Sequence, residues 1–133
     1  MGYCIELIEK NFKIKPNCEV ELINKIKEFC KNFKGYNGDG KITWVDKNSV
    51  LESNSLEEIF DEFRYPLTKL DDGSYDIDYF SGEKLGDDYS FFFTIAPFVE
   101  DGSYIEMLGE DGDKWRWIFK DGKCNEKYPK VEW

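Results

Sequence analysis

Three short β-compatible segments at the carboxyl end constrain the fold of this chain most strongly. They read SYIEML (residues 103–108), KWRWIF (114–119) and KCNEKY (123–128), and the connections between them are GEDGD and KDG. Asp-Gly pairs in such short connections are typical of tight hairpin turns. Because tight hairpins join neighbouring antiparallel strands, this part of the chain predicts a three-stranded antiparallel meander.

Alternation along the middle strand assigns its side chains to two faces. Trp115, Trp117 and Phe119 share one face, and we expect this face to pack beneath helices. The alternative is an exposed aromatic platform for a base, a sugar or a peptide. Arg116 falls on the other face, where we expect it to pair across strands with an acid such as Glu106.

The first half of the chain alternates between extended and helical patterns. Residues 3–8 are apolar and predict a first strand that can extend to Ile14. From Val20 to Phe33 apolar residues recur at steps of three and four, which predicts an amphipathic helix ended by Gly35. Residues 41–45 predict a short strand, and residues 46–52 predict one helical turn.

The middle of the chain predicts two more helices and one strand. Ser55 and Glu58 form a capping-box pattern at the start of a helix that runs to residue 63. Tyr75, Ile77 and Tyr79 alternate with acids, which predicts a strand over residues 75–79. Residues 89–99 predict a helix capped by Asp88 and kinked at Pro97.

These elements predict one α+β domain spanning residues 1–133. We expect a mostly antiparallel sheet with two to three helices on one face. The order β-α-β followed by β-α-β is ferredoxin-like, with an added C-terminal β-hairpin. A chain of 133 residues that is 41% hydrophobic is long enough for one real core and too short for two ordinary domains.

Several reaction classes are excluded or disfavoured by composition. The chain has no histidine, which excludes Ser-His and Cys-His nucleophile systems and mixed Cys-His zinc sites. It also lacks both glycine-rich phosphate-binding fingerprints. Cys4, Cys18, Cys30 and Cys124 form no C-x-x-C pair and are interpreted as reduced thiols. We expect no enzymatic activity and no cofactor, and the absence of a leader pattern or an apolar span predicts a cytoplasmic protein with no membrane contact.

The loop GYNGDGKITWVD, from Gly35 to Asp46, partly matches a calcium-binding EF-hand loop. Asn37, Asp39 and Asp46 fall at ligand positions, but Gly35 supplies no side chain at the first position. The residues that leave the loop are expected to form a strand, where an EF-hand requires a helix. We therefore interpret the loop as a turn between elements and expect no metal site.

Charge is distributed unevenly along the chain. Residues 1–51 carry 7 acids and 9 bases, residues 52–113 carry 18 acids and 3 bases, and residues 114–133 carry 3 acids and 6 bases. The middle block thus has a net charge of −15 within a chain of net −10. Direct binding to nucleic acid is disfavoured, because phosphate contacts need clustered Lys and Arg. A basic protein is the electrostatic complement.

The segment EDGSYIEMLGEDGDKWRWIFKDGK (residues 100–123) resembles a signature of small uncharacterised bacterial and mobile-element proteins. The shared features are the G-S-Y-I-E strand, the G-E-D-G turn and the W-R-W-x-F strand. The resemblance implies a ferredoxin-like α+β domain and supplies no activity and no catalytic residue.

The acidic block predicts a partner-binding surface on which carboxylates imitate a phosphate backbone. Such a protein would inhibit a nuclease or nucleic-acid-binding partner, in the manner of an immunity-like or anti-CRISPR protein. A host regulatory or structural interaction module, and a small-ligand or metal-ion binder, remain as alternatives. The candidate partner-binding residues are Glu57, Glu58, Asp61, Glu62, Asp71, Asp72, Asp76, Asp78, Asp87, Asp88, Glu110 and Asp111.

Overall fold

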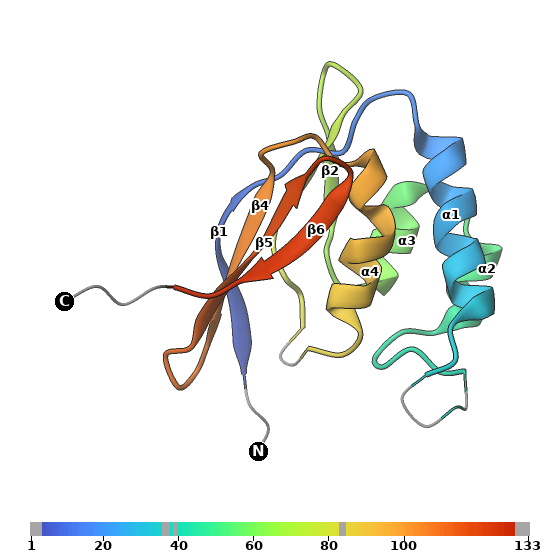
Figure 1. The fold of residues 1–133 in the computed structure, drawn as a ribbon. Coiled ribbons are helices and arrows are strands. Elements are labelled where there is room, and N and C mark those ends of the chain that lie inside the picture. Colours follow the sequence, from blue (N-terminus) through green and yellow to red (C-terminus); the bar gives the residue numbers. More distant parts are fainter. Residues whose placement is uncertain (1–3, 36–37, 39, 83–84, 130–133) are drawn as a thin grey trace.

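The structure, a computed structural model, describes residues 4–35, 38, 40–82 and 85–129 (Figure 1). Its elements, in chain order, are β1 (Ile5–Asn11), α1 (Glu19–Asn32), α2 (Lys47–Glu52), α3 (Leu56–Glu62), β2 (Leu67–Lys69), β3 (Tyr75–Ile77), α4 (Asp88–Ile95), the 3₁₀ helix η1 (Ala96–Phe98), β4 (Tyr104–Gly109), β5 (Lys114–Lys120) and β6 (Lys123–Lys127). This combination of helices with antiparallel strands confirms the predicted α+β class.

The larger sheet has the strand order β1-β4-β5-β6, and all its neighbouring strands are antiparallel. The C-terminal meander is therefore confirmed. Asp121 and Gly122, between β5 and β6, both have positive φ (54° and 72°), as expected for a type I′ turn. Helices α1 to α4 lie on one side of this sheet, and no described helix covers its other side, which is called here the uncovered face (Figure 1).

The ferredoxin-like strand order is not confirmed. Strands β2 and β3 pair with each other in a separate two-stranded sheet, and Ile14 bridges both Tyr75 of β3 and Val99. The predicted strand at residues 41–45 is wrong. Its amide at Val45 donates to the carbonyl of Ile42 (3.1 Å) in a turn, and Trp44 has φ 68°, which extended chain does not allow.

Local signals placed most helix starts correctly. The Ser55 hydroxyl accepts a hydrogen bond from the amide of Glu58 (3.1 Å), and Asp46 accepts from the amides of Asn48 and Ser49 at the start of α2. Asp88 was predicted as the cap of α4, but it is the first helical residue and Asp87 precedes it as the cap position. This prediction is wrong because the Asp88 side chain turns into the protein.

The core lies between the larger sheet and the helices. Trp117 and Phe119 are buried against Phe92 of α4, with ring centroids 5.0 and 6.0 Å apart, and Phe12 meets Phe119 at 5.5 Å. Packing of the aromatic face of β5 beneath helices is thus confirmed. Tyr79 was predicted to face the same way as Tyr75, but it is 55% exposed because β3 ends at Ile77.

Within the part of the chain that the structure describes, no helix is both long enough and apolar enough to cross a membrane.

Candidate interaction surfaces

The predicted partner-binding acids fall into separate places in the structure. Helix α3 carries Glu57, Glu58 and Asp61 on its exposed side. Among the described residues none of these three carboxylates forms an ion pair. Glu62, at the end of the same helix, is half-buried and accepts a hydrogen bond from the amide of Asp46 (3.1 Å). Three of the four α3 acids are therefore open to a partner.

The β2–β3 hairpin carries four more of the predicted acids. Asp71 and Asp72 are exposed in its turn, and Asp72 accepts from the amide of Ser74 (2.9 Å) and lies 3.8 Å from the Lys13 ammonium. The hydrogen bonds from Ser74 lower the pKa of Asp72. The strand acids are engaged within the fold, because Asp76 pairs with Lys10 (2.7 Å) and Asp78 accepts from the Thr68 hydroxyl (2.6 Å).

The start of α3 and the hairpin lie beside each other at Tyr75. Burial, together with the negative charges of Glu57 and Glu19, raises the pKa of Tyr75 to about 12. Helix α3 contacts β2, and the Lys69 ammonium of β2 lies 3.9 Å from the Glu19 carboxylate in the first turn of α1. The exposed residues Glu57, Glu58, Asp61, Asp71 and Asp72 form what is called here the acidic surface.

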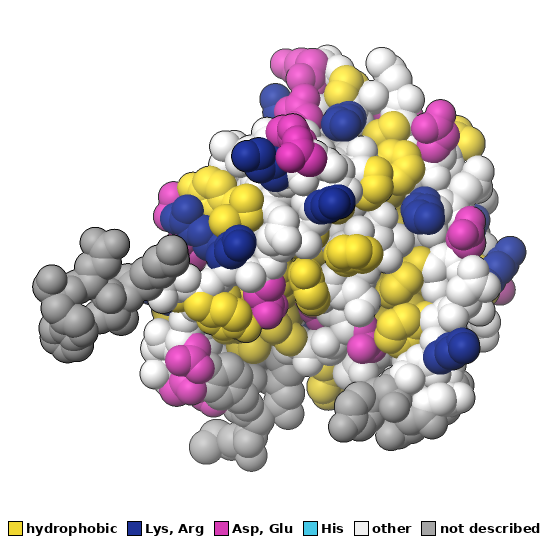
Figure 2. All heavy atoms as spheres, viewed as in Figure 1, with side chains coloured by type: hydrophobic (Ala, Val, Ile, Leu, Met, Phe, Trp, Pro, Cys, Tyr) yellow, Lys and Arg dark blue, Asp and Glu magenta, His cyan; other side chains and the backbone are white. Residues whose placement is uncertain are grey.

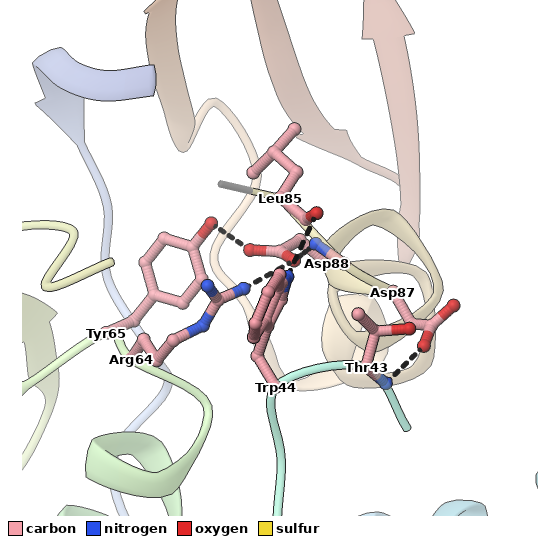
Figure 3. Close-up of polar contacts among 8 residues, drawn as sticks. Thr43, Trp44, Arg64, Tyr65, Leu85, Asp87 and Asp88 are labelled. Carbon is pink, nitrogen blue, oxygen red and sulfur yellow. Dashed lines mark hydrogen bonds and ion pairs between the residues drawn. The ribbon is translucent and has the colours of Figure 1, made fainter. Parts of the chain in front are cut away.

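Asp88 does not belong to any surface. It is 6% exposed, and its carboxylate accepts hydrogen bonds from the Tyr65 hydroxyl (2.6 Å), the Gly86 amide (2.7 Å) and the Arg64 guanidinium (3.1 Å). Figure 3 shows Arg64 and Tyr65 converging on this carboxylate from the chain that follows α3. The prediction that Asp88 binds a partner is wrong, because an internal cation and two internal donors already occupy it.

Asp87 also serves the fold. Its carboxylate accepts a hydrogen bond from the amide of Thr43 (2.8 Å) and thereby holds the 40–46 loop against the start of α4 (Figure 3). The indole of Trp44 donates to the carbonyl of Leu85 (3.3 Å) at the same junction. Burial and the Asp88 charge raise the pKa of Tyr65 well above its usual value. We interpret the contacts of Asp87 and Asp88 as stabilising the fold.

Glu110 and Asp111 lie far from the acidic surface. They occupy the β4–β5 turn, whereas Asp121 in the β5–β6 turn donates its amide to Asp101 at the opposite end of β5. β5 has seven residues, so the two ends are separated by about 20 Å. Lys13 contacts both Asp72, through its ammonium, and Ser103, through its amide, so the β2–β3 turn lies near the end of β5 that carries Asp121. The twelve predicted residues therefore do not form one continuous face.

The loop that partly matches an EF-hand offers no supporting ligands among the described residues. Asn37 and Asp39 lie outside the part that the structure describes. Asp46, the twelfth position, instead caps α2 with its carboxylate. No group of three or more Cys, Asp or Glu suited to a metal ion is found in residues 4–35, 38, 40–82 and 85–129.

Sequence reasoning missed the distribution of the basic residues. A cavity of about 340 Å³ beside the C-terminal strands contains none of the predicted partner-binding residues. It is lined by Glu106, Lys114, Trp115, Arg116, Lys127, Tyr128 and Pro129. The signal was present in the net charge of +3 over residues 114–133, but only the strand pairing shows that these cations share a face.

Comparisons of the chain with protein-family models, with curated proteins and with solved structures found no match. The resemblance of residues 100–123 to a bacterial and mobile-element signature therefore stays a prediction.

Proposed function

We propose that this chain is a non-enzymatic binding protein that inhibits a nuclease or nucleic-acid-binding partner by presenting its acidic surface in place of nucleic acid. The observation that carries the proposal is the exposed trio Glu57, Glu58 and Asp61, which has no ion pair among the described residues. An immunity-like or anti-CRISPR-like inhibitor is the concrete form.

Glu57 and Glu58 lie in the first turn of α3, where the helix dipole favours negative charge, but Asp61 is placed where it does not help the helix. Asp61 lies in the last turn, where the helix dipole disfavours a negative charge. It also lies four residues after Glu57, and like charges at this spacing destabilise a helix by about 0.2–0.5 kcal/mol. Charge that opposes local stability, with no internal cation to neutralise it, supports a role in binding an external cation.

The dimensions of the acidic surface suit a nucleic-acid-binding groove. Helix α3 has seven residues and is about 10 Å long, so its three carboxylates are spaced on the scale of neighbouring phosphate groups. Asp71 and Asp72 add two exposed carboxylates in the turn of the β2–β3 hairpin, whose strand β2 contacts α3. Lys or Arg side chains that normally hold phosphates would pair with these carboxylates, and association would be fast and sensitive to salt.

The test compares two charge-reversal variants with equal change in net charge. Glu57→Lys/Asp61→Lys alters the acidic surface, and Glu110→Lys/Asp113→Lys alters the β4–β5 turn at a distance. Each variant and the wild type is immobilised and exposed to a bacterial extract freed of nucleic acid. We expect the wild type and the turn variant to capture nucleic-acid-binding proteins that short duplex DNA displaces and that about 0.5 M salt releases.

The α3 variant should lose these captured proteins, and the wild type should slow cleavage by any captured nuclease. If the α3 variant captures the same proteins as the wild type, the acidic surface is not the binding site. If duplex DNA fails to displace the captured proteins, they do not bind through a nucleic-acid groove. That second outcome would favour the alternative of a host regulatory interaction module.

A further inference from the structure

The uncovered face of the β5–β6 hairpin carries a row of cations in an otherwise acidic protein. Lys120 and Lys123 are direct cross-strand partners, and so are Arg116 and Lys127. Alternation places all four side chains, with Lys114, on the face turned away from the helices. The chain contains 28 acids and only 18 bases, yet five bases gather here.

This arrangement is unfavourable for the hairpin itself. Like charges directly opposite each other across antiparallel strands destabilise the pair. Among the described residues, Lys114, Lys120, Lys123 and Lys127 form no ion pair with a carboxylate. Only Arg116 is neutralised, by Glu106 (2.6 Å) and by Glu9 (4.0 Å) on the neighbouring strands. The four lysines are therefore available to an anionic ligand.

A cavity adjoins one end of this cationic row. Its volume is about 340 Å³, within the range of small-molecule sites. It is lined by Glu106, which is paired with Arg116, and by Lys114, Trp115, Arg116, Lys127, Tyr128 and Pro129. Tyr128 is 65% exposed, and its hydroxyl donates to Glu126 (2.7 Å), whose carboxylate also accepts from the Trp117 indole (2.9 Å). Figure 2 shows Lys and Arg side chains beside hydrophobic ones at the edge where the chain leaves β6. An aromatic ring next to cations suits a flat, negatively charged ligand.

We propose that the β5–β6 hairpin binds single-stranded nucleic acid along its cationic row, with one base entering the cavity at Tyr128. The row extends along the seven residues of β5, about 20 Å, which is too long for a single phosphate group. Backbone phosphates follow the four lysines, and the base stacks on the aromatic ring. An open sheet face admits an extended strand without rearrangement.

A net charge of −10 over the whole chain disfavours binding to nucleic acid if the charges are evenly spread. The structure separates the charges, because α3 lies across the core from the uncovered face (Figure 1). Charges beyond about 8 Å are largely screened at physiological salt. The β1 and β4 half of the same face holds Glu9 and Glu106, so the strand is confined to the β5–β6 half.

The test measures binding of a fluorescein-labelled 12-nucleotide oligo-dT by anisotropy between 50 and 200 mM salt. Four lysine contacts predict a slope of about −2.8 in log affinity against log salt, or roughly a 50-fold loss over this range. Lys120→Gln/Lys123→Gln should reduce the slope to about −1.4. The matched control Lys25→Gln/Lys31→Gln, on the exposed side of α1, should leave it unchanged.

Two further variants separate binding from folding. Tyr128→Ala should lower affinity by roughly 5- to 150-fold without changing the salt slope, as expected for a lost stacking contact. Lys123→Glu should weaken binding and yet raise the melting temperature by about 1–4 °C, because it replaces a like-charge pair with an opposite-charge pair. A binding defect in a more stable variant cannot be ascribed to misfolding.

The proposal is overturned if the oligonucleotide does not bind at 50 mM salt, or if Lys120→Gln/Lys123→Gln leaves the slope unchanged. It is also overturned if poly-glutamate of equal charge binds more tightly, since an acidic protein segment is then the ligand. The inference is independent of the acidic surface, because Glu57→Lys/Asp61→Lys should retain oligonucleotide binding.

Discussion

Replacing Asp88 with alanine tests the interpretation that this carboxylate stabilises the fold. The substitution removes three hydrogen bonds, one of which is also the ion pair with the Arg64 guanidinium, whose side chain is only 15% exposed. It also leaves the hydroxyl of the fully buried Tyr65 without its acceptor. Removing one partner of a buried ion pair destabilises a protein by about 3–5 kcal/mol. For a chain of 133 residues this corresponds to a fall in melting temperature of roughly 10–15 °C.

The assay is urea unfolding followed by circular dichroism, with thermal unfolding as a second measure. Asp78→Ala is the matched control, since Asp78 is exposed and its carboxylate accepts only from Thr68 among the described side chains. We expect the control to lose at most about 1 kcal/mol. The combination of Asp88→Ala with Tyr65→Phe should be less damaging than the sum of the two, because both remove the same hydrogen bond. If Asp88→Ala is as stable as Asp78→Ala, the interpretation that the Asp88 carboxylate stabilises the fold is wrong.

Three other predictions follow from the buried groups and the caps. The folded pKa of Tyr75, about 12, lies above the usual value near 10, so the stability contributed by its protonated phenol is complete below pH 10 and is lost as pH rises toward 12. Tyr75→Phe should reduce the dependence of the free energy of unfolding on pH between 10 and 12. An unchanged pH dependence would refute the assignment. Burial raises the thiol pKa of Cys30 to about 11 and of Cys124 to about 12, so iodoacetamide at pH 8 should label neither thiol until urea is added, as peptide mass spectrometry would show. Asp46→Ala should lower the free energy of unfolding by about 1 kcal/mol through loss of the α2 cap. Addition of 1 mM calcium should leave the wild-type melting temperature unchanged, and a calcium-dependent rise would restore the metal-site interpretation.

The elements with strong local periodicity were predictable from the sequence. The spacing of Leu22, Ile26 and Cys30 produced an amphipathic helix whose buried stripe matches the structure. The Asp-Gly turns defined the C-terminal meander, because connections of two to four residues leave the flanking strands no choice of partner. Residues 41–45 were wrongly predicted as a strand, since β-branched and aromatic residues favour strands on average, yet this segment pairs with none of the described strands and Trp44 is 55% exposed.

The candidate sites were only partly predictable. Sequence patterns correctly assigned exposed acids to α3, where helical spacing alone defines the outer side. They could not distinguish Asp87 and Asp88 from surface acids, because the partners Thr43, Arg64 and Tyr65 lie 23 to 44 residues away in the chain. The cationic row was overlooked for a related reason, since cross-strand pairing had to place Lys120 against Lys123 and Arg116 against Lys127.

The α+β class, the meander and most of the helices follow from local signals, because these depend on turn chemistry and side-chain periodicity within a few residues. The pairing of β1 with β4, across a separation of about a hundred residues, and the separate sheet of β2 and β3 depend on packing between distant segments. That packing also decides which carboxylates face water. A charged side chain near a buried cation and internal donors is stabilised inside the protein, and that neighbourhood is set by packing between distant segments.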